Sequence, residues 1–293
     1  MSERSDWFIE KSANDGTAIG VRVTAKLHSE QSEFQRIEVF ESSNCGRVMV
    51  IDNCFMLSDL DHFIYHEVIT HSALLAHPNP QQVAIIGGGD CGTLSEVLKH
   101  RCVTDAWLVE IDERVTRVAE AQFPALCARN QDPRARFEFT DGIAWISDQP
   151  ENSLDVLIVD STDPVGPAAG LFHLDFYRAC RRALRDDGVL IEQSGSPLLH
   201  AASMQGPMHR DLEHAGFANR RTLGFPLSIY PSGWWSVTLA SNSPLDLRQE
   251  RWNSERLETL YLTPQVAAAT AQLPPFVQAA IERGKASSAT PGH

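Results

Sequence analysis

The sequence lacks several features that mark whole classes of protein. No apolar run is long enough to span a bilayer, and residues 1–6 lack the apolar core of a signal peptide. We therefore expect a cytoplasmic protein that does not enter membranes. The six cysteines contain no CxxC pair, and their scatter favours free thiols over a disulfide framework or a zinc site.

Positive charge is also scarce. The chain has 25 lysine and arginine residues against 38 aspartate and glutamate residues, and its formal net charge at pH 7 is −13. Such a balance disfavours binding to nucleic acid and to anionic membranes, whereas it attracts a small cationic ligand. We expect neither nucleic acid nor membrane as a partner. The 293 residues suffice for a large domain with a smaller appendage.

A metal site is not expected either. His62, His66 and His71 crowd one segment with Glu67, but His66 and His71 are five residues apart. The zinc-binding HExxH helix places its histidines four residues apart, and no further ligand cluster follows nearby. We predict that this segment holds no metal.

Residues 1–60 have the pattern of a small antiparallel β domain. Apolar and polar side chains alternate, and Asp52-Asn53 forms a predicted turn between two short strands. The predicted strands cover residues 21–27, 36–40, 48–51 and 54–57. A helix is then expected over 61–77, ended by Pro78 and Pro80.

Strands and helices alternate from residue 82 onward. We expect strands at 83–86, 106–111, 135–139, 154–160 and 189–192, and helices at 93–100, 113–122, 144–148, 172–184 and 200–215. This alternation predicts an α/β domain over 61–285, with a parallel sheet covered by helices on both faces. Residues 217–223 and 235–240 are expected to add an antiparallel edge. A polar helix is predicted near 254–260, and a disordered tail over 286–293.

A nucleotide-binding turn is predicted at the run Ala84-Ile85-Ile86-Gly87-Gly88-Gly89-Asp90. Glycines let the backbone approach a ligand, and Glu110 follows about 20 residues on, where such folds place a ribose-binding carboxylate. Asp90 is unusual, because a carboxylate at this position repels a pyrophosphate and attracts a cation.

Each of the first four predicted parallel strands ends in acid. The acids are Asp90, Glu110 with Asp112, Asp141 followed by Gly142, and Asp160 with Asp163. Because parallel strands end at one edge of a sheet, we expect these carboxylates around one crevice, except Asp112, which is better explained as a helix N-cap. Their mutual repulsion calls for a cationic ligand or for shifted pKa values.

Two further features bear on this crevice. The connection over 160–170 is long, which favours a lid carrying catalytic groups over a surface connector stiffened by prolines. Tyr65 and Tyr230 could line the pocket, although core packing is the alternative for each. Trp234 and Trp235 are expected in the core or in an interface.

Together these residues resemble the polyamine aminopropyltransferases, above all the spermidine synthases. The matching runs are 63–67, 77–80, 85–90, 109–112, 141–142, 160–167 and 230–233. The resemblance implies an N-terminal β domain and a Rossmann-like, seven-stranded methyltransferase-type domain. It also implies transfer of the aminopropyl group of decarboxylated S-adenosylmethionine, as a co-substrate without a further cofactor, to a diamine. A homodimer or homotetramer is expected.

The resemblance also implies roles for individual residues. Asp160 would be the general base, helped by Tyr65. The donor would be held by Gln35, His66, Gly87, Gly88, Gly89, Asp90, Glu110, Asp141 and Gly142, with Glu110 on the ribose, Asp141 on the adenine amino group and Asp90 on the ammonium. The diamine would be held by Trp7, Asp163, Gln193 and Tyr230.

The choice of acceptor is left open. Met56, Ile229 and Trp234 depart from the family's usual residues, so cadaverine, agmatine or spermidine could replace putrescine. Three other functions compete with aminopropyl transfer: an S-adenosylmethionine-dependent methyltransferase, a nicotinamide dehydrogenase, which Asp90 opposes, and a non-catalytic polyamine-binding homologue.

Overall fold

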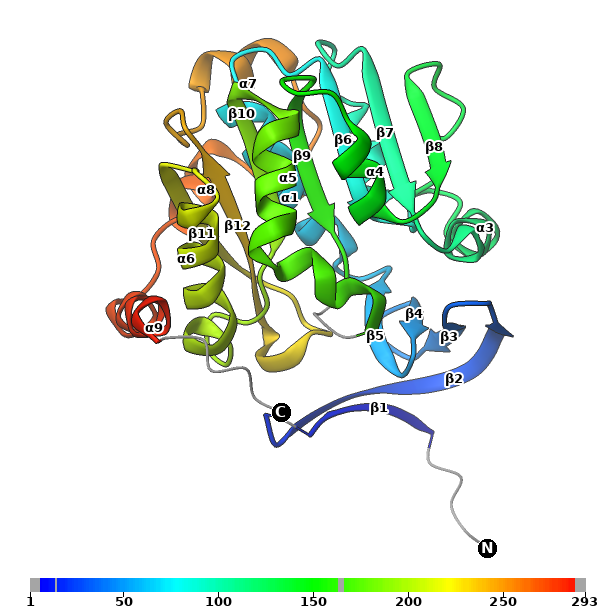
Figure 1. Ribbon diagram of the computed structural model, residues 1–293. Coiled ribbons are helices and arrows are strands. Elements are labelled where there is room, and N and C mark those ends of the chain that lie inside the picture. The colour runs from blue at the N-terminus through cyan, green and yellow to red at the C-terminus, as the bar shows by residue number, and fades with distance from the viewer. Residues whose placement is uncertain (1–5, 14, 163–165, 288–293) are drawn as a thin grey trace, which may run out of the picture.

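The chain forms a five-stranded antiparallel sheet followed by a seven-stranded sheet flanked by helices (Figure 1). The structure is a computed structural model that describes residues 6–13, 15–162 and 166–287. The predicted fold class, an α/β sheet domain preceded by an antiparallel β domain, is confirmed. Within these residues, no helix combines the length and the apolar character needed to cross a membrane.

The N-terminal sheet runs in sequence order. Its strands are β1 (Trp7–Ser12), β2 (Thr17–Gln31), β3 (Arg36–Ser42), β4 (Arg47–Ile51) and β5 (Cys54–Ser58). The predicted turn between β4 and β5 is confirmed, since Ile51 pairs with Cys54 and Asp52 and Asn53 both have positive φ. Strand β1 was missed, and β2 is much longer than the predicted strand, because these segments are half exposed and carry a weak hydrophobic pattern.

The large sheet has the order β11-β12-β10-β9-β6-β7-β8. Its strands are β6 (Gln82–Gly87), β7 (Asp105–Glu110), β8 (Ala135–Phe139), β9 (Leu154–Asp160), β10 (Leu184–Gln193), β11 (Asn219–Pro226) and β12 (Trp234–Ser241). Strands β6 to β10 pair in parallel, and β11 and β12 form an antiparallel edge, as predicted.

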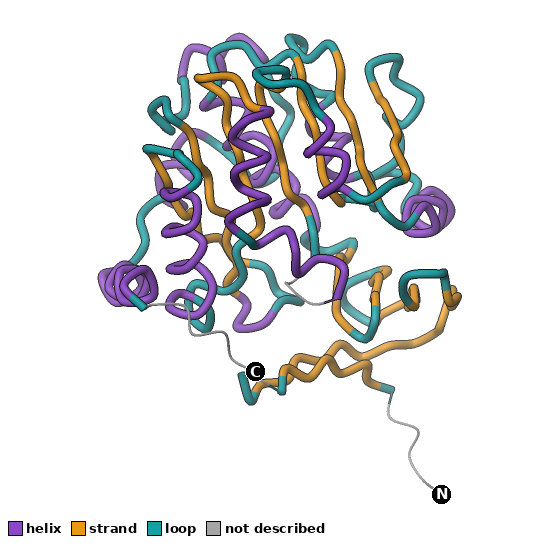
Figure 2. The backbone as a smooth tube through the Cα atoms, viewed as in Figure 1, coloured by secondary structure: helices purple, strands orange, loops and turns teal. Residues whose placement is uncertain are grey.

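Helices cover both faces of this sheet (Figure 2). Val83 and Ile85 of β6 face one apolar cluster, which includes α1 (His62–Ala76) and α2 (Gly92–Val97). Ala84 and Ile86 face the opposite cluster, which includes α4 (Gly142–Asp148), α5 (Leu174–Ala183) and α6 (Gly206–His214). Burial on both faces explains why the central strands read as continuous apolar runs. Helix α3 (Glu113–Gln122) packs against the N-terminal sheet.

The structure corrects two predicted helices. The helix expected over 200–215 begins as a π-helical turn (Ala201–Gln205) and continues as α6, with Pro207 in the first turn of α6. Proline has no N–H to donate, so the regular ladder cannot run through it. The polar helix expected near 254–260 is wrong, because α7 spans Gln249–Glu255 and Arg256 ends it in a left-handed conformation.

Backbone N–H groups after α7 bind a side chain and do not continue the helix. Those of Leu260, Tyr261 and Leu262 all donate to the buried carboxylate of Glu67 on α1. They are therefore not free to form a helix. Beyond them lie α8 (Pro264–Thr270) and α9 (Pro275–Ala286), and most of the predicted tail lies outside the described residues.

Candidate active site

The candidate site lies at the C-terminal ends of the parallel strands. In Figure 1 the strands β6, β7 and β9 end beside the N-terminal sheet, which lies across this edge. Among the hydrogen bonds that join the layers, Gln35 Nε2 donates to Asp112 Oδ2 at 3.0 Å and the Tyr230 hydroxyl donates to Met56 O at 2.5 Å. Open parallel sheets bind ligands at this edge.

The glycine turn is in tight contact with the end of β9. Gly87 and Gly88 both have positive φ, and a Cβ on Gly87 would lie 2.2 Å from Asp160 O. The Gly88 N–H donates to the same carbonyl oxygen at 2.8 Å. A Cβ on Gly89 would lie 2.8 Å from a carboxylate oxygen of Glu110. Glycine is therefore required here because the strand ends approach the turn so closely.

Asp160 is held by two hydroxyl groups. The Tyr65 hydroxyl donates to Oδ1 at 2.7 Å, and Thr93 Oγ1 donates to Oδ2 at 2.6 Å. Burial and the neighbouring charge of Asp90 raise the pKa of Asp160. Thr93 is not among the predicted site residues, although its place at the start of the helix after the glycines brings it close to the end of β9.

Asp90 stays charged in spite of its burial. Its Oδ1 accepts the Gly92 N–H at 2.7 Å, and its Oδ2 lies 3.4 Å from His66 Nε2. Burial alone would raise the pKa of Asp90, but His66 and the Gly92 N–H outweigh it and hold the pKa below its ordinary value. Among the described residues, no lysine or arginine forms an ion pair with Asp90, Glu110 or Asp160.

Glu110 is a buried carboxylate at the end of β7. Burial raises its pKa to about 7, although Glu110 accepts the Asp112 N–H at 2.9 Å. Asp112 caps α3 as predicted, by accepting the Arg114 N–H. Gln35, predicted to line the donor site, donates its amide to Asp112, which also accepts a hydrogen bond from Ser32. The N-terminal sheet thus fixes the loop next to Glu110.

Asp141 lies exposed after β8, where it accepts the Ile143 N–H at 2.7 Å and caps α4. A Cβ on Gly142 would lie 2.4 Å from the side chain of Ile86, so only glycine fits against β6. Both residues lie at the same sheet edge as Asp90, and the predicted adenine contact of Asp141 stays a prediction.

The residues predicted to hold the diamine come from β1, β10, the connection after β9 and the segment before β12. The Tyr230 ring lies 6.4 Å from that of Tyr65, and Gln193 Nε2 donates to Thr162 O at 3.3 Å. Trp7 is 53% exposed on β1. Asp163 lies outside the described residues, so its predicted role stays a prediction.

Met56, Ile229 and Trp234, which depart from the family pattern, all pack against apolar clusters. Ile229 is buried in the apolar cluster of the N-terminal sheet, and Trp234 packs against the cluster that contains α9. Met56 is partly buried against the cluster that joins the N-terminal sheet to α3, and its carbonyl oxygen binds Tyr230. Trp235 is buried in the core, as expected.

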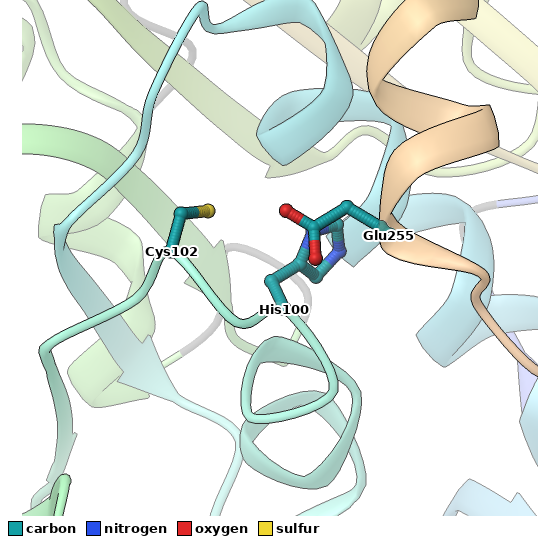
Figure 3. Close-up of side chains that lie close together, drawn as sticks. All are labelled: His100, Cys102 and Glu255. Atoms are coloured by element: carbon teal, nitrogen blue, oxygen red, sulfur yellow. The ribbon is translucent and has the colours of Figure 1, made fainter.

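Three potential metal ligands gather elsewhere. Ligand atoms of His100, Cys102 and Glu255 lie within 4.8 Å of one another, close to the start of β7 (Figure 3). Arg251 Nη2 already lies 3.1 Å from Cys102 Sγ and 3.0 Å from Glu255 Oε1. A metal cation would meet this guanidinium at close range, and burial raises the pKa of Cys102 to about 11, so the thiol is a poor ligand. We interpret the group as an ion-paired anchor for α7.

The histidines that crowd α1 separate into two groups. His62 Nδ1 lies 3.3 Å from His66 Nδ1, whereas His71 contacts Glu96 and His100.

The site as a whole gathers carboxylates, a tyrosine hydroxyl and a histidine around a glycine turn. This arrangement can bind a cation and accept a proton from it.

The chain matches two protein families along its length. Residues 6–59 match the family described as "Spermidine synthase tetramerisation domain", and residues 62–249 match "Spermine/spermidine synthase domain". A polyamine aminopropyltransferase from Methylococcus capsulatus is 50% identical over 277 residues, which are 94% of this chain and 97% of that protein. One from Xylella fastidiosa is 49% identical and covers 96% of this chain and 99% of its own.

Solved structures give the same result. A spermidine synthase in complex with the transition-state analogue AdoDATO superposes with a TM-score of 0.89 at 34% identity, covering 94% of each chain. Spermidine synthase from Thermotoga maritima superposes with a TM-score of 0.88, also at 34% identity and over 94% of each chain.

Proposed function

The chain belongs to the spermine/spermidine synthase family and is a polyamine aminopropyltransferase, and we propose that it makes spermidine from putrescine. The donor is decarboxylated S-adenosylmethionine, and the second product is methylthioadenosine. The observation that carries this proposal is the pair Asp160 and Tyr65, whose oxygens lie 2.7 Å apart beside the charged Asp90. The pair provides a base for an amine next to an anchor for a cation.

The mechanism follows from the charge of the acceptor. A primary amine is protonated near neutral pH, so it cannot attack until a base removes a proton. Asp160 accepts that proton, and Tyr65 and Thr93 hold its carboxylate in place. The free amine then attacks the carbon bonded to the sulfonium, that carbon–sulfur bond breaks, and the sulfur keeps the electron pair. Alignment of the reactants supplies much of the rate.

The donor lies over the glycine turn in this proposal. Glu110 accepts hydrogen bonds from the ribose hydroxyls, and Asp141 binds the adenine amino group. Asp90 binds the ammonium of the aminopropyl arm, with Gln35 and His66 beside it. Ordinary S-adenosylmethionine carries a carboxylate that would face Asp90, and this repulsion selects the decarboxylated donor.

The acceptor lies on the other side of Asp160. We assign Gln193, Tyr230, Asp163 and Trp7 to this side, and the assignment is supported by the contact of Gln193 with Thr162 and by the proximity of the Tyr230 and Tyr65 rings. Two ammonium groups at the ends of a short alkyl chain fit a site with acid at both ends and aromatic walls. The base and the donor acids are separate from these residues.

A product assay tests this proposal. The protein is incubated with decarboxylated S-adenosylmethionine and, separately, putrescine, cadaverine, agmatine or spermidine, and the products are identified by mass. We expect spermidine and methylthioadenosine in equal amounts, with putrescine as the preferred acceptor. Preference for another amine would overturn the choice of putrescine, and binding of diamines without any methylthioadenosine would indicate a non-catalytic homologue.

Tighter binding of S-adenosylmethionine than of the decarboxylated form would favour a methyltransferase instead. Isothermal titration of both donors measures this directly. We expect the decarboxylated donor to bind more tightly, because Asp90 attracts its ammonium without meeting a carboxylate.

We also propose a homodimer or homotetramer that forms through the N-terminal sheet. Its residues match the tetramerisation domain of spermidine synthases, and Trp7, Ile9 and Leu27 expose large apolar side chains on β1 and β2. Light scattering after size-exclusion chromatography measures the assembly. A monomer at micromolar concentration would contradict this proposal.

A further inference from the structure

Two histidines on consecutive turns of α1 form a row that ends at Asp90. His62 Nδ1 lies 3.3 Å from His66 Nδ1, and His66 Nε2 lies 3.4 Å from Asp90 Oδ2. The His66 ring is buried and lies against Gly92, where a Cβ would approach the ring to 2.1 Å. His66 is therefore fixed between its two partners, whereas His62 is only partly buried.

The charges around His66 decide which histidine carries a proton. Asp90, Asp160 and Glu96 face it from the strand ends and from α2, and His62 and Tyr65 face it from α1. Burial opposes the charged form, but the carboxylates outweigh it and raise the pKa of His66. Burial, followed by the neighbouring His66, lowers the pKa of His62 to about 4.

The directions of these two pKa shifts determine which ring nitrogens of His62 and His66 donate hydrogen bonds and which accept them. A protonated His66 donates from Nε2 to Asp90 and from Nδ1 to the neutral His62, which accepts at its own Nδ1. His66 thus supplies positive charge to the acidic crevice before a substrate binds. The donor brings a sulfonium and an ammonium to the same place, and both repel an imidazolium.

We propose that His66 is a counter-ion that the donor displaces as a proton, and that His62 is the positioning residue that accepts the hydrogen bond of the protonated His66. This inference rests on the proposed function. When the donor binds, His66 Nδ1 releases its proton to water. No other bond changes, and His66 remains a neutral donor to Asp90 through Nε2. The donor thus binds a crevice whose acids are fully charged.

Proton release on binding tests the inference. Isothermal titration near neutral pH in two buffers of different ionisation enthalpy counts the protons released per ligand. The two ligands are decarboxylated S-adenosylmethionine and methylthioadenosine, which lacks the sulfonium and the ammonium. Both ligands carry the ribose, so any proton from Glu110 cancels in the difference. We expect up to about one proton more for the cationic donor, and equal release for both ligands would overturn the inference.

Variants locate the proton. His66→Gln should abolish the difference between the ligands, and His62→Leu should reduce it, since His66 loses its acceptor. His62→Gln should retain it, because the amide oxygen accepts the same hydrogen bond, and His28→Gln on β2 is the matched control. A full difference in His66→Gln would contradict the inference, and the comparison of ligands in the unmodified protein decides the matter should that variant not fold.

The proposed function and the role of His66 can each be contradicted without the other. Turnover with putrescine is measured on the same preparations. Absence of turnover in the unmodified protein would contradict the proposed function, whereas turnover with equal proton release would contradict the role of His66 and leave that function standing.

Discussion

Asp160 combines two properties that a base for an amine requires. Tyr65 and Thr93 each donate a hydrogen bond to one of its carboxylate oxygens, so its orientation is set before a substrate arrives. Burial and the charge of Asp90 raise its pKa, which makes it a stronger proton acceptor than an exposed aspartate.

Replacing Asp160 by Asn should therefore lower turnover by about 10²–10⁴-fold, the usual contribution of general-base catalysis. Affinity for methylthioadenosine should change little, because Glu110 and Asp141 remain. Steady-state kinetics and titration of methylthioadenosine check both statements. Asp175→Asn, on the exposed face of α5, is the control, and near-normal turnover in Asp160→Asn would refute the mechanism.

Thr93→Val should lower kcat by about tenfold while KM for the donor changes little, since the base loses one of its two orienting hydrogen bonds. Thr93→Ser keeps the hydroxyl and should restore most of the activity. Equal activity of the valine and serine variants would show that the hydrogen bond to Asp160 has no catalytic role.

Donor affinity should depend on pH through Glu110. Its pKa is about 7 in the free protein, and ribose hydroxyls bind the charged carboxylate, so binding lowers this pKa. The affinity for methylthioadenosine therefore reaches its full value above about pH 7. Below that pH it weakens by up to tenfold for each pH unit. The Kd is measured from about pH 5.5 to pH 8.5, and Glu110→Gln should flatten the profile. A Kd for the unmodified protein that is constant over this range would exclude Glu110 from ribose binding.

The sequence was sufficient to predict helices and strands where the hydrophobic pattern of the segment is strong. Strands β6 to β9 and α1 were predicted to within one residue at each end, because burial gives continuous apolar runs, whereas β10 begins at Leu184 and not at the predicted residue 189. The glycine turn and the acids Asp90, Glu110 and Asp160 could be predicted because each of them lies at or directly after the end of a predicted strand. The contacts of Thr93 with Asp160 and of His66 with Asp90 were not found, since they join helices to strand ends in a way that a linear pattern does not encode.

Helix α1 depends on a segment that lies far from it in the sequence. Glu67 accepts three backbone N–H groups from residues 260–262, and it directly follows the site residues Tyr65 and His66. The position of these site residues is thus tied to the C-terminal part of the chain.

Glu67→Gln should lower the free energy of unfolding by about 2–4 kcal/mol, because a buried carboxylate with several N–H donors is replaced by an amide that can accept at only one atom. Urea denaturation measures the change. Glu282→Gln, on the exposed side of α9, should change stability by less than about 0.5 kcal/mol. Equal stability of both variants would show that the 260–262 contact contributes nothing.

The whole molecule carries an excess of negative charge, and the substrates proposed for it are positive. A net charge of −13 attracts putrescine from a distance, and dissolved salt screens this attraction. Raising ionic strength from about 0.05 to 0.5 M should increase KM for putrescine several-fold and leave kcat nearly unchanged. Binding of the neutral methylthioadenosine is the control. A KM that does not respond to salt would confine the attraction to groups in direct contact with the substrate.

The contact between Gly87 and the end of β9 has a consequence for how such an enzyme can diversify. The turn proposed to carry the donor and the strand that ends in Asp160 touch through backbone atoms, so neither can shift without the other. Of the residues assigned to the acceptor, Trp7, Gln193 and Tyr230 come from β1, β10 and the segment before β12, which lie outside that contact. A lineage can therefore exchange one amine substrate for another by altering peripheral segments, while the geometry of bond making and breaking is inherited unchanged.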